Sequence, residues 1–265
     1  MALPPAAQNA EGAGVSPLLE LREVSKSFGG LRAVANVSFA IGEAEIVGLI
    51  GPNGAGKTTL FNLINGVFKP DGGKILFAGA DVTGLAPNKI AHRGLARTHQ
   101  IVKPLNQLTV LDNVIVGACF GPEDLPLKQA AEVAHKVLEE VGLAQRAQTL
   151  ARELTIAGKK RLEVARALAA RPKAILLDEV LAGLNPSEVA HMIEIIRAIR
   201  QCGISVFMIE HLMQAIMNLS ERIIVLNFGE KIAEGAPAEV ARDPQVVEAY
   251  LGDPNIAEKL METNG

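Results

Sequence analysis

Cysteine and aromatic residues are scarce in this sequence. It has two cysteines, Cys119 and Cys202, one tyrosine and no tryptophan among 265 residues. Two cysteines far apart and outside any CxxC spacing argue against a structural zinc site and are typical of a reducing compartment. Few aromatic side chains leave few platforms for stacking on nucleic-acid bases. Since 26 basic residues face 29 acidic ones, for a net charge of −3, we predict no nucleic-acid partner.

Long hydrophobic runs are also missing. Apolar stretches such as 204–209 are far shorter than the roughly 18 residues that span a bilayer, so the chain is not expected to form a membrane channel. Residues 1–17 are rich in Ala, Pro and Gly but lack the basic start and apolar centre of a secretion signal. We interpret them as a disordered tail. The remaining chain is long enough to bury a substantial core.

The first half of the ordered chain shows two kinds of strand pattern. Apolar and polar residues alternate over 18–24 and 33–41, which predicts an antiparallel sheet. Residues 45–50 form a short, nearly continuous apolar run, typical of a strand covered on both faces. A glycine-rich turn follows, and 58–64 is predicted to be a helix that stops at Gly66.

Between Pro87 and Thr155 the strand signal disappears and helical spacing takes over, which predicts a helical insertion. Apolar strand-like runs return at 174–177, 204–209 and 222–226. A helix beginning at the N-cap Asn185 separates the first two runs. Alternating strands and helices indicate a mostly parallel sheet with helices on its faces.

Residues 51–58 match the pattern G-x-x-x-x-G-K-[ST] at every required position. The glycines let backbone N–H groups curl around phosphate oxygens, and the following helix points its positive dipole end at the same anion. Lys57 is expected to contact the β and γ phosphates and Thr58 to coordinate Mg²⁺. The predicted phosphate-binding loop, or P-loop, comprises Gly51, Pro52, Asn53, Gly54, Ala55, Gly56, Lys57, Thr58 and Thr59.

Two carboxylates follow the apolar run at 174–177. Asp178 and Glu179 come at the exit of a buried strand, the edge where open α/β sheets bind ligands. We expect Asp178 to hold Mg²⁺ through its water shell and Glu179 to act as general base toward the attacking water.

From Leu18 to Gly252 the sequence resembles the nucleotide-binding subunit of ABC transporters. The resemblance implies that Phe28 stacks on adenine. It also implies that Gln100, at the join to the helical insertion, senses Mg²⁺ and the membrane subunit, and that His211 contacts the γ phosphate. ATP and Mg²⁺ are the implied cofactors. Glu179, His211 and Gln100 are the implied catalytic residues, and Thr58, Gln100 and Asp178 the metal-binding ones.

The segment 154–161 occupies the place of the family signature LSGGQ but departs from it. Thr155 keeps the hydroxyl, whereas Ile156 and Ala157 occupy the glycine positions and Gly158 the glutamine position. The resemblance implies that Thr155, Ala157 and Gly158 contact the γ phosphate held by a partner subunit, less tightly because of the added Cβ of Ala157. Gly158 would restore the approach if the register shifted by one residue.

Three basic residues, 159–161, follow the signature segment. They indicate a solvated basic face, with added positive charge toward the phosphate as the alternative. The next family segment, the D-loop, corresponds to 180–185, where Val180 replaces the usual Pro and Asn185 the usual Asp. Asn185 can still cap a helix.

Several segments, among them ARTHQ (96–100), AGLNP, IEH and EAYLG, resemble the ATPases of branched-chain amino acid importers. The resemblance implies a cytoplasmic-face, peripheral subunit that pairs with an identical or paralogous ATPase and with membrane permease subunits, and indirectly with a solute-binding protein. Related importers of amides, urea or carboxylates and a lipopolysaccharide exporter share most of these segments. The alternatives from other classes are a soluble non-transport ABC ATPase and a small-molecule P-loop kinase.

The expected fold is therefore an α/β P-loop NTPase with a mostly parallel core sheet, an N-terminal antiparallel β-subdomain and an inserted helical subdomain. We divide the chain into a tail (1–17), the β-subdomain and P-loop core (18–86), the helical insertion (87–155), the rest of the ATPase core (156–235) and a C-terminal helical extension (236–265).

Overall fold

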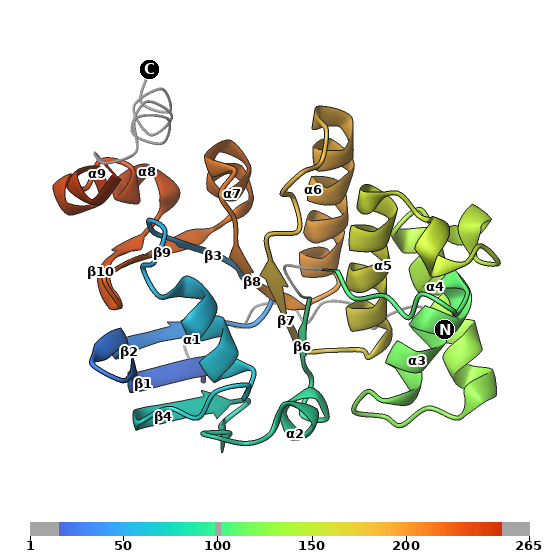
Figure 1. Cartoon of the computed structure of the whole chain (residues 1–265), viewed down its shortest axis with the longest axis horizontal. Helices are drawn as coiled ribbons and strands as arrows, with labels where there is room; N and C mark the ends of the chain where they lie inside the picture. The colour runs from blue at the N-terminus through green and yellow to red at the C-terminus, as the bar shows by residue number, and fades with distance from the viewer. Residues whose placement is uncertain (1–15, 99–101, 251–265) are drawn as a thin grey trace.

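Two β-sheets form the framework of the protein in a computed structural model that describes residues 16–98 and 102–250. One sheet is antiparallel with strand order β2-β1-β4-β5, and the other has the order β10-β9-β3-β8-β7-β6 (Figure 1). Strands β9, β3, β8, β7 and β6 run parallel, and β10 is antiparallel to β9. The strands are β1 Leu19–Phe28, β2 Leu31–Ile41, β3 Ile46–Ile50, β4 Gly72–Phe77, β5 Ala80–Asp81, β6 Leu95–Arg97, β7 Ala174–Asp178, β8 Ser205–Ile209, β9 Arg222–Asn227 and β10 Glu230–Gly235.

Helices cover the larger sheet and form a separate cluster at one end of the molecule, where α3 and α4 lie beside α5 (Figure 1). The described helices are α1 Lys57–Ile64, α2 Pro87–Ala91, α3 Val110–Cys119, α4 Leu127–Glu140, α5 Ile156–Ala169, α6 Pro186–Gln201, α7 Met213–Leu219, α8 Pro237–Val240 and α9 Pro244–Tyr250, with short 3-10 turns at Ala144–Arg146 and Ala151–Glu153. No helix in the described ranges combines the length and apolar character needed to cross a lipid bilayer.

Helix α1 is buried between the two sheets. Side chains alternate along β3, so Val47 and Leu49 face α1 and the antiparallel sheet, whereas Ile46 and Ile50 face the helices on the other side. Phe61 of α1 packs on Phe207 of β8 with ring centroids 5.0 Å apart. Because apolar burial stabilises by about 25 cal/mol per Å², this double-sided packing fixes the start of α1 relative to β3.

The α/β fold predicted from the sequence is confirmed, including the opening antiparallel strands and the mainly parallel second sheet. The Asn185 cap is confirmed as well, since its side-chain oxygen accepts the N–H of Glu188 at 3.0 Å at the start of α6. One interpretation is wrong: a strand, β6, lies inside the segment 87–155 and pairs with β7. Its three residues are too few to show a period of two. The division of the chain into domains stays a prediction.

Candidate functional site

Three neighbouring strands position the predicted site residues at one edge of the larger sheet. Strand β3 leads into the P-loop, β7 ends at Asp178, and β8 leads to Glu210 and His211. Because β3, β8 and β7 are adjacent and parallel, their carboxyl ends meet at the same edge. The burial of all five residues in each of these strands makes the edge a rigid platform.

The P-loop has a backbone that requires glycine at two places. A Cβ on Gly51 would lie 2.1 Å from the carbonyl oxygen of Leu226, and one on Gly56, at φ 101°, would lie 2.3 Å from that of Ala33. The loop is therefore packed between β9 and β2. Among residues 16–98 and 102–250 no side chain caps the start of α1, so its first-turn N–H groups remain available to an anion.

Lys57 lies inside this loop. Its Nζ donates hydrogen bonds to the carbonyl oxygens of Gly51 at 2.6 Å and Pro52 at 3.0 Å. Burial lowers the pKa of Lys57, while the nearby carboxylates of Glu179 and Asp178 act in the opposite direction. The ammonium group is thus held inside the loop, within electrostatic reach of both carboxylates, and its contact with phosphate stays a prediction.

Asp178 is buried at the end of β7, and its two carboxylate oxygens have different surroundings. Its Oδ2 accepts a hydrogen bond from Arg97 Nη2 at 2.9 Å, and Arg97 Nη1 reaches Asn62 Oδ1 of α1 at 2.6 Å. Its Oδ1 is buried without a hydrogen-bond partner among the described residues. An orphaned, buried carboxylate oxygen suits a hydrated Mg²⁺, as does the exposed hydroxyl-bearing residue Thr58. The residues present therefore fit the metal.

Glu179 and His211 face each other across the strand ends. Glu179 Oε1 lies 2.9 Å from His211 Nε2, although the two residues are 32 positions apart in the sequence. The side chain of Glu179 is largely buried, at 16% exposure, while that of His211 is 43% exposed. Glu179 also has a positive φ of 52°. A carboxylate held in place beside a partly open histidine is suited to orient and deprotonate a water molecule.

The signature segment begins helix α5. Thr155 caps the helix, because its Oγ1 accepts the N–H of Gly158 at 3.1 Å. Ile156 is exposed, whereas Ala157 and Gly158 are buried. A Cβ on Gly158 would meet Leu154 at 3.2 Å, so Gly158 faces its own subunit and offers no open approach in this conformation.

The interpretation of residues 159–161 as a solvated basic face is wrong for Lys160. Lys160 is only 7% exposed and donates to the carbonyl oxygens of Glu179 and Ala182. Arg161 donates to the carbonyl oxygen of Gly142 at 3.1 Å. The run of three charges suggested solvent because nothing in the local sequence shows which carbonyl groups the fold brings near.

Of the remaining two predicted residues, the structure describes only Phe28. Phe28 ends β1 with 42% of its surface exposed and makes an edge-on contact with Phe68, ring centroids 5.2 Å apart. An aromatic face that is partly open at the β1–β2 turn suits stacking on a planar base. Gln100 lies outside the described residues.

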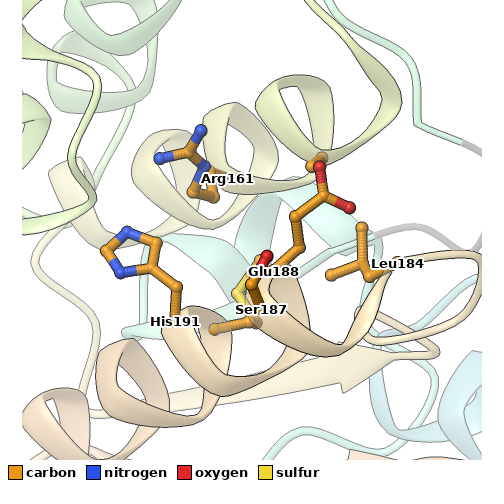
Figure 2. A pocket seen from close by; sticks show the side chains of 7 residues that line it. Arg161, Leu184, Ser187, Glu188 and His191 are labelled. Atoms are coloured by element: carbon orange, nitrogen blue, oxygen red, sulfur yellow. The ribbon is translucent and has the colours of Figure 1, made fainter.

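Two hollows are open to the surface near these elements. A cavity of about 650 Å³ lies between the P-loop residues 52–55, the β9–β10 turn with Phe228, and α9. A smaller one of about 130 Å³ separates α5 from α6, with Arg161, Glu188 and His191 around it (Figure 2). Glu188 in this smaller pocket accepts the N–H of Asn185, and Arg161 binds the Gly142 carbonyl. The polar groups of the smaller pocket therefore stabilise helix ends and turns.

Sequence reasoning assigned no role to Arg97 or Glu210, and it did not predict the contacts of Lys160 with backbone carbonyl groups. Glu210 is 3% exposed and its Oε1 accepts the N–H of Leu181 at 2.8 Å. The pKa of Glu210 is raised to about 7, chiefly by burial. The negative charge of Glu179 also raises it, whereas the hydrogen bonds from the Leu181 and His211 backbone and the charge of Lys160 lower it. The only sequence signal was an acidic residue directly after an apolar strand.

This raised pKa predicts a pH-dependent stability. In the unfolded chain Glu210 ionises near pH 4.5, so the folded protein binds the extra proton between pH 4.5 and about 7. The stability contributed by the neutral form is present below pH 4.5 and is lost as the pH rises through 7, by up to about 3 kcal/mol.

We expect Glu210→Gln to flatten this part of the curve of unfolding free energy against pH. Urea denaturation at pH 5, 6, 7 and 8 measures it, with Glu194→Gln, exposed on α6, as control. Parallel curves for Glu210→Gln and wild type would contradict the assignment.

Comparison with known proteins gives concordant similarities. The sequence matches the family described as ABC transporter over residues 34–182, and the one described as branched-chain amino acid ATP-binding cassette transporter over residues 230–254. It is 39% identical over 251 residues to LivG, the high-affinity branched-chain amino acid transport ATP-binding protein of Salmonella typhimurium, covering 89% of this chain and 98% of LivG. Identity to LptB, the lipopolysaccharide export system ATP-binding protein of Haemophilus influenzae, is 36% over 236 residues, with coverage of 89% and 98%.

Solved structures agree with these sequence matches. A nucleotide-free ATP-binding cassette from an ABC transporter superposes with a TM-score of 0.82 at 32% identity, over 90% of this chain and all of that one. An ABC transporter cassette in its ADP conformation gives a TM-score of 0.82 at 33% identity over the same shares.

Proposed function

Because this chain belongs to the ABC transporter family, as an ATP-binding and ATP-hydrolysing subunit, we propose that it powers the uptake of branched-chain amino acids or related small polar solutes. The observation that supports this cargo class is the match of residues 230–254 to the branched-chain amino acid cassette family. The relative BraF of Pseudomonas aeruginosa, 38% identical over 251 residues, is named for the same transport.

We propose that the strand-end site binds ATP with Mg²⁺ and that each group there has a separate task. The P-loop amides and Lys57 hold the phosphate tail, and Phe28 stacks on the base. Asp178, Thr58 and Gln100 would hold Mg²⁺, which neutralises phosphate charge when bound. Glu179 takes a proton from the attacking water. His211, whose Nε2 lies 2.9 Å from Glu179 Oε1, orients Glu179 and contacts the γ phosphate.

The working unit that we propose is a dimer of this chain with an identical or paralogous ATPase, on the cytoplasmic face of the membrane. Each P-loop then faces the partner's signature segment at Thr155 and Ile156, the exposed residues of that segment, whereas Ala157 and Gly158, also expected at this contact, are buried. ATP joins the two subunits, and hydrolysis releases them, so that attached permease subunits follow the motion. The Ile156 side chain is exposed at the start of α5. If the partner subunit carries two glycines at the corresponding positions, the two ATP sites of the dimer should hydrolyse ATP at unequal rates.

Transport by the assembled complex tests this proposal. We expect the tagged chain to co-purify with permease subunits and, in proteoliposomes with the matching solute-binding protein, to drive accumulation of labelled leucine, isoleucine or valine. Complexes containing Glu179→Gln serve as the control that cannot use ATP. Accumulation of only an amide, urea or carboxylate would correct the cargo, and co-purification with lipopolysaccharide-export components would replace uptake by export, the activity named for LptB.

A further inference from the structure

We propose that Lys160 is a positioning residue for Glu179. Its side chain binds the backbone of the segment that begins at Glu179 and thereby links this segment to helix α5, which carries the signature segment. Lys160 lies in the second turn of α5, and its Nζ donates hydrogen bonds to the carbonyl oxygens of Glu179 and Ala182, each at 2.6 Å. The inference rests on the proposed role of Glu179 as general base. An ammonium group bound to two carbonyl groups within a buried site makes stronger hydrogen bonds than a neutral donor would.

Glu210 holds the same segment from the β8 side. Its Oε1 accepts the N–H of Leu181 at 2.8 Å, and the N–H of Glu179 donates to the carbonyl oxygen of Ile209 at 2.9 Å. Both Lys160 and Glu210 are almost fully buried. The backbone of 179–182 is thus fixed by α5 on one side and by the end of β8 on the other. We call this set of contacts the backbone clamp.

The segment needs such support because its conformation is unfavourable without it. Glu179 has a φ of 52°, in the left-handed region that a residue with a Cβ rarely adopts. This turn aims the Glu179 carboxylate at His211. If the backbone relaxed, the carboxylate would swing away, and misplacement of a catalytic group by about 1 Å can cost on the order of 10²-fold in rate.

The clamp also joins two functions in one helix. Thr155, the N-cap of α5, belongs to the segment proposed to meet the partner's nucleotide, and Lys160 lies on the same rigid helix. A shift of α5 on dimer closure is therefore transmitted to the carbonyl groups of Glu179 and Ala182. This gives a direct mechanical path between the partner's nucleotide and the general base of this subunit.

Steady-state ATP hydrolysis by the full-length chain tests the clamp. We expect Lys160→Met, which keeps the aliphatic stem, to lower kcat about 10-fold or more while the KM and Kd for Mg·ATP change less than about 3-fold. Lys160→Arg should restore most of kcat, because a guanidinium can donate to both carbonyl groups. Lys136→Met is the matched control, since this lysine is exposed on α4, away from the strand-end site, and has no side-chain hydrogen bond within the described parts of the chain.

The double variant Lys160→Met with Glu179→Gln separates positioning from general damage. We expect it to hydrolyse ATP no more slowly than Glu179→Gln alone, because a base that is absent cannot be misplaced. An unchanged kcat in Lys160→Met, or an equal loss in Lys136→Met, overturns the proposal. If Lys160→Met melts too low to assay, Lys160→Gln replaces it under the same criteria. Normal turnover by Glu179→Gln would instead reject the base assignment itself, so the two failures are distinguishable.

Discussion

Replacing Glu179 by glutamine is expected to lower kcat for ATP hydrolysis by about 10²- to 10⁴-fold, the usual contribution of a general base. Glutamine has the shape of glutamate but cannot accept the proton of the attacking water. ATP affinity should change little, because the Lys57 ammonium and the P-loop amides, which we propose to hold the phosphates, are untouched. Under the proposed dimer mechanism the variant should accumulate as an ATP-bound dimer.

Phosphate release under saturating Mg·ATP and size-exclusion chromatography with and without ATP measure both effects. Glu194→Gln makes the same chemical change on the exposed face of α6, where Glu194 forms a surface ion pair with Arg197, and should behave as wild type. Turnover within about 3-fold of wild type in Glu179→Gln would show that another group removes the proton.

Lys57→Ala is expected to weaken Mg·ATP binding by about 100-fold. The substitution removes a buried ammonium whose charge-assisted hydrogen bonds to phosphate are each worth about 1.5–3 kcal/mol. It also removes the hydrogen bonds from Nζ to the Gly51 and Pro52 carbonyl groups, so the empty loop should become looser. The loss of charge and the loss of preorganisation act in the same direction.

Isothermal titration with Mg·ATP, and with a non-hydrolysable analogue, measures the affinity of the full-length chain. The control is Lys89→Ala, which removes an exposed lysine from α2. Far-ultraviolet circular dichroism verifies that both variants keep the wild-type secondary structure. ATP affinity that is unchanged in Lys57→Ala would contradict the phosphate role of the P-loop lysine.

Much of the fold followed from local pattern. The continuous apolar runs became the fully buried strands β3, β7 and β8, because a strand covered on both faces is apolar at most of its positions. The P-loop motif and the Asn185 cap were readable because their hydrogen bonds join residues close in sequence. Strand β6 escaped detection because three residues carry no measurable periodicity.

The sequence by itself determined the residue types at the site: a glycine-rich loop with Lys57, a strand ending in Asp178 and Glu179, and a histidine after the next strand. Only the tertiary structure decided which groups support them. Arg97 meets Asp178, and Lys160 reaches the carbonyl group of Glu179, because parallel strand order and the seating of α5 bring together residues separated by 81 and 19 positions. Because Lys160 is buried, its ammonium group donates hydrogen bonds to backbone carbonyl groups instead of to water, since a charge removed from water needs polar partners.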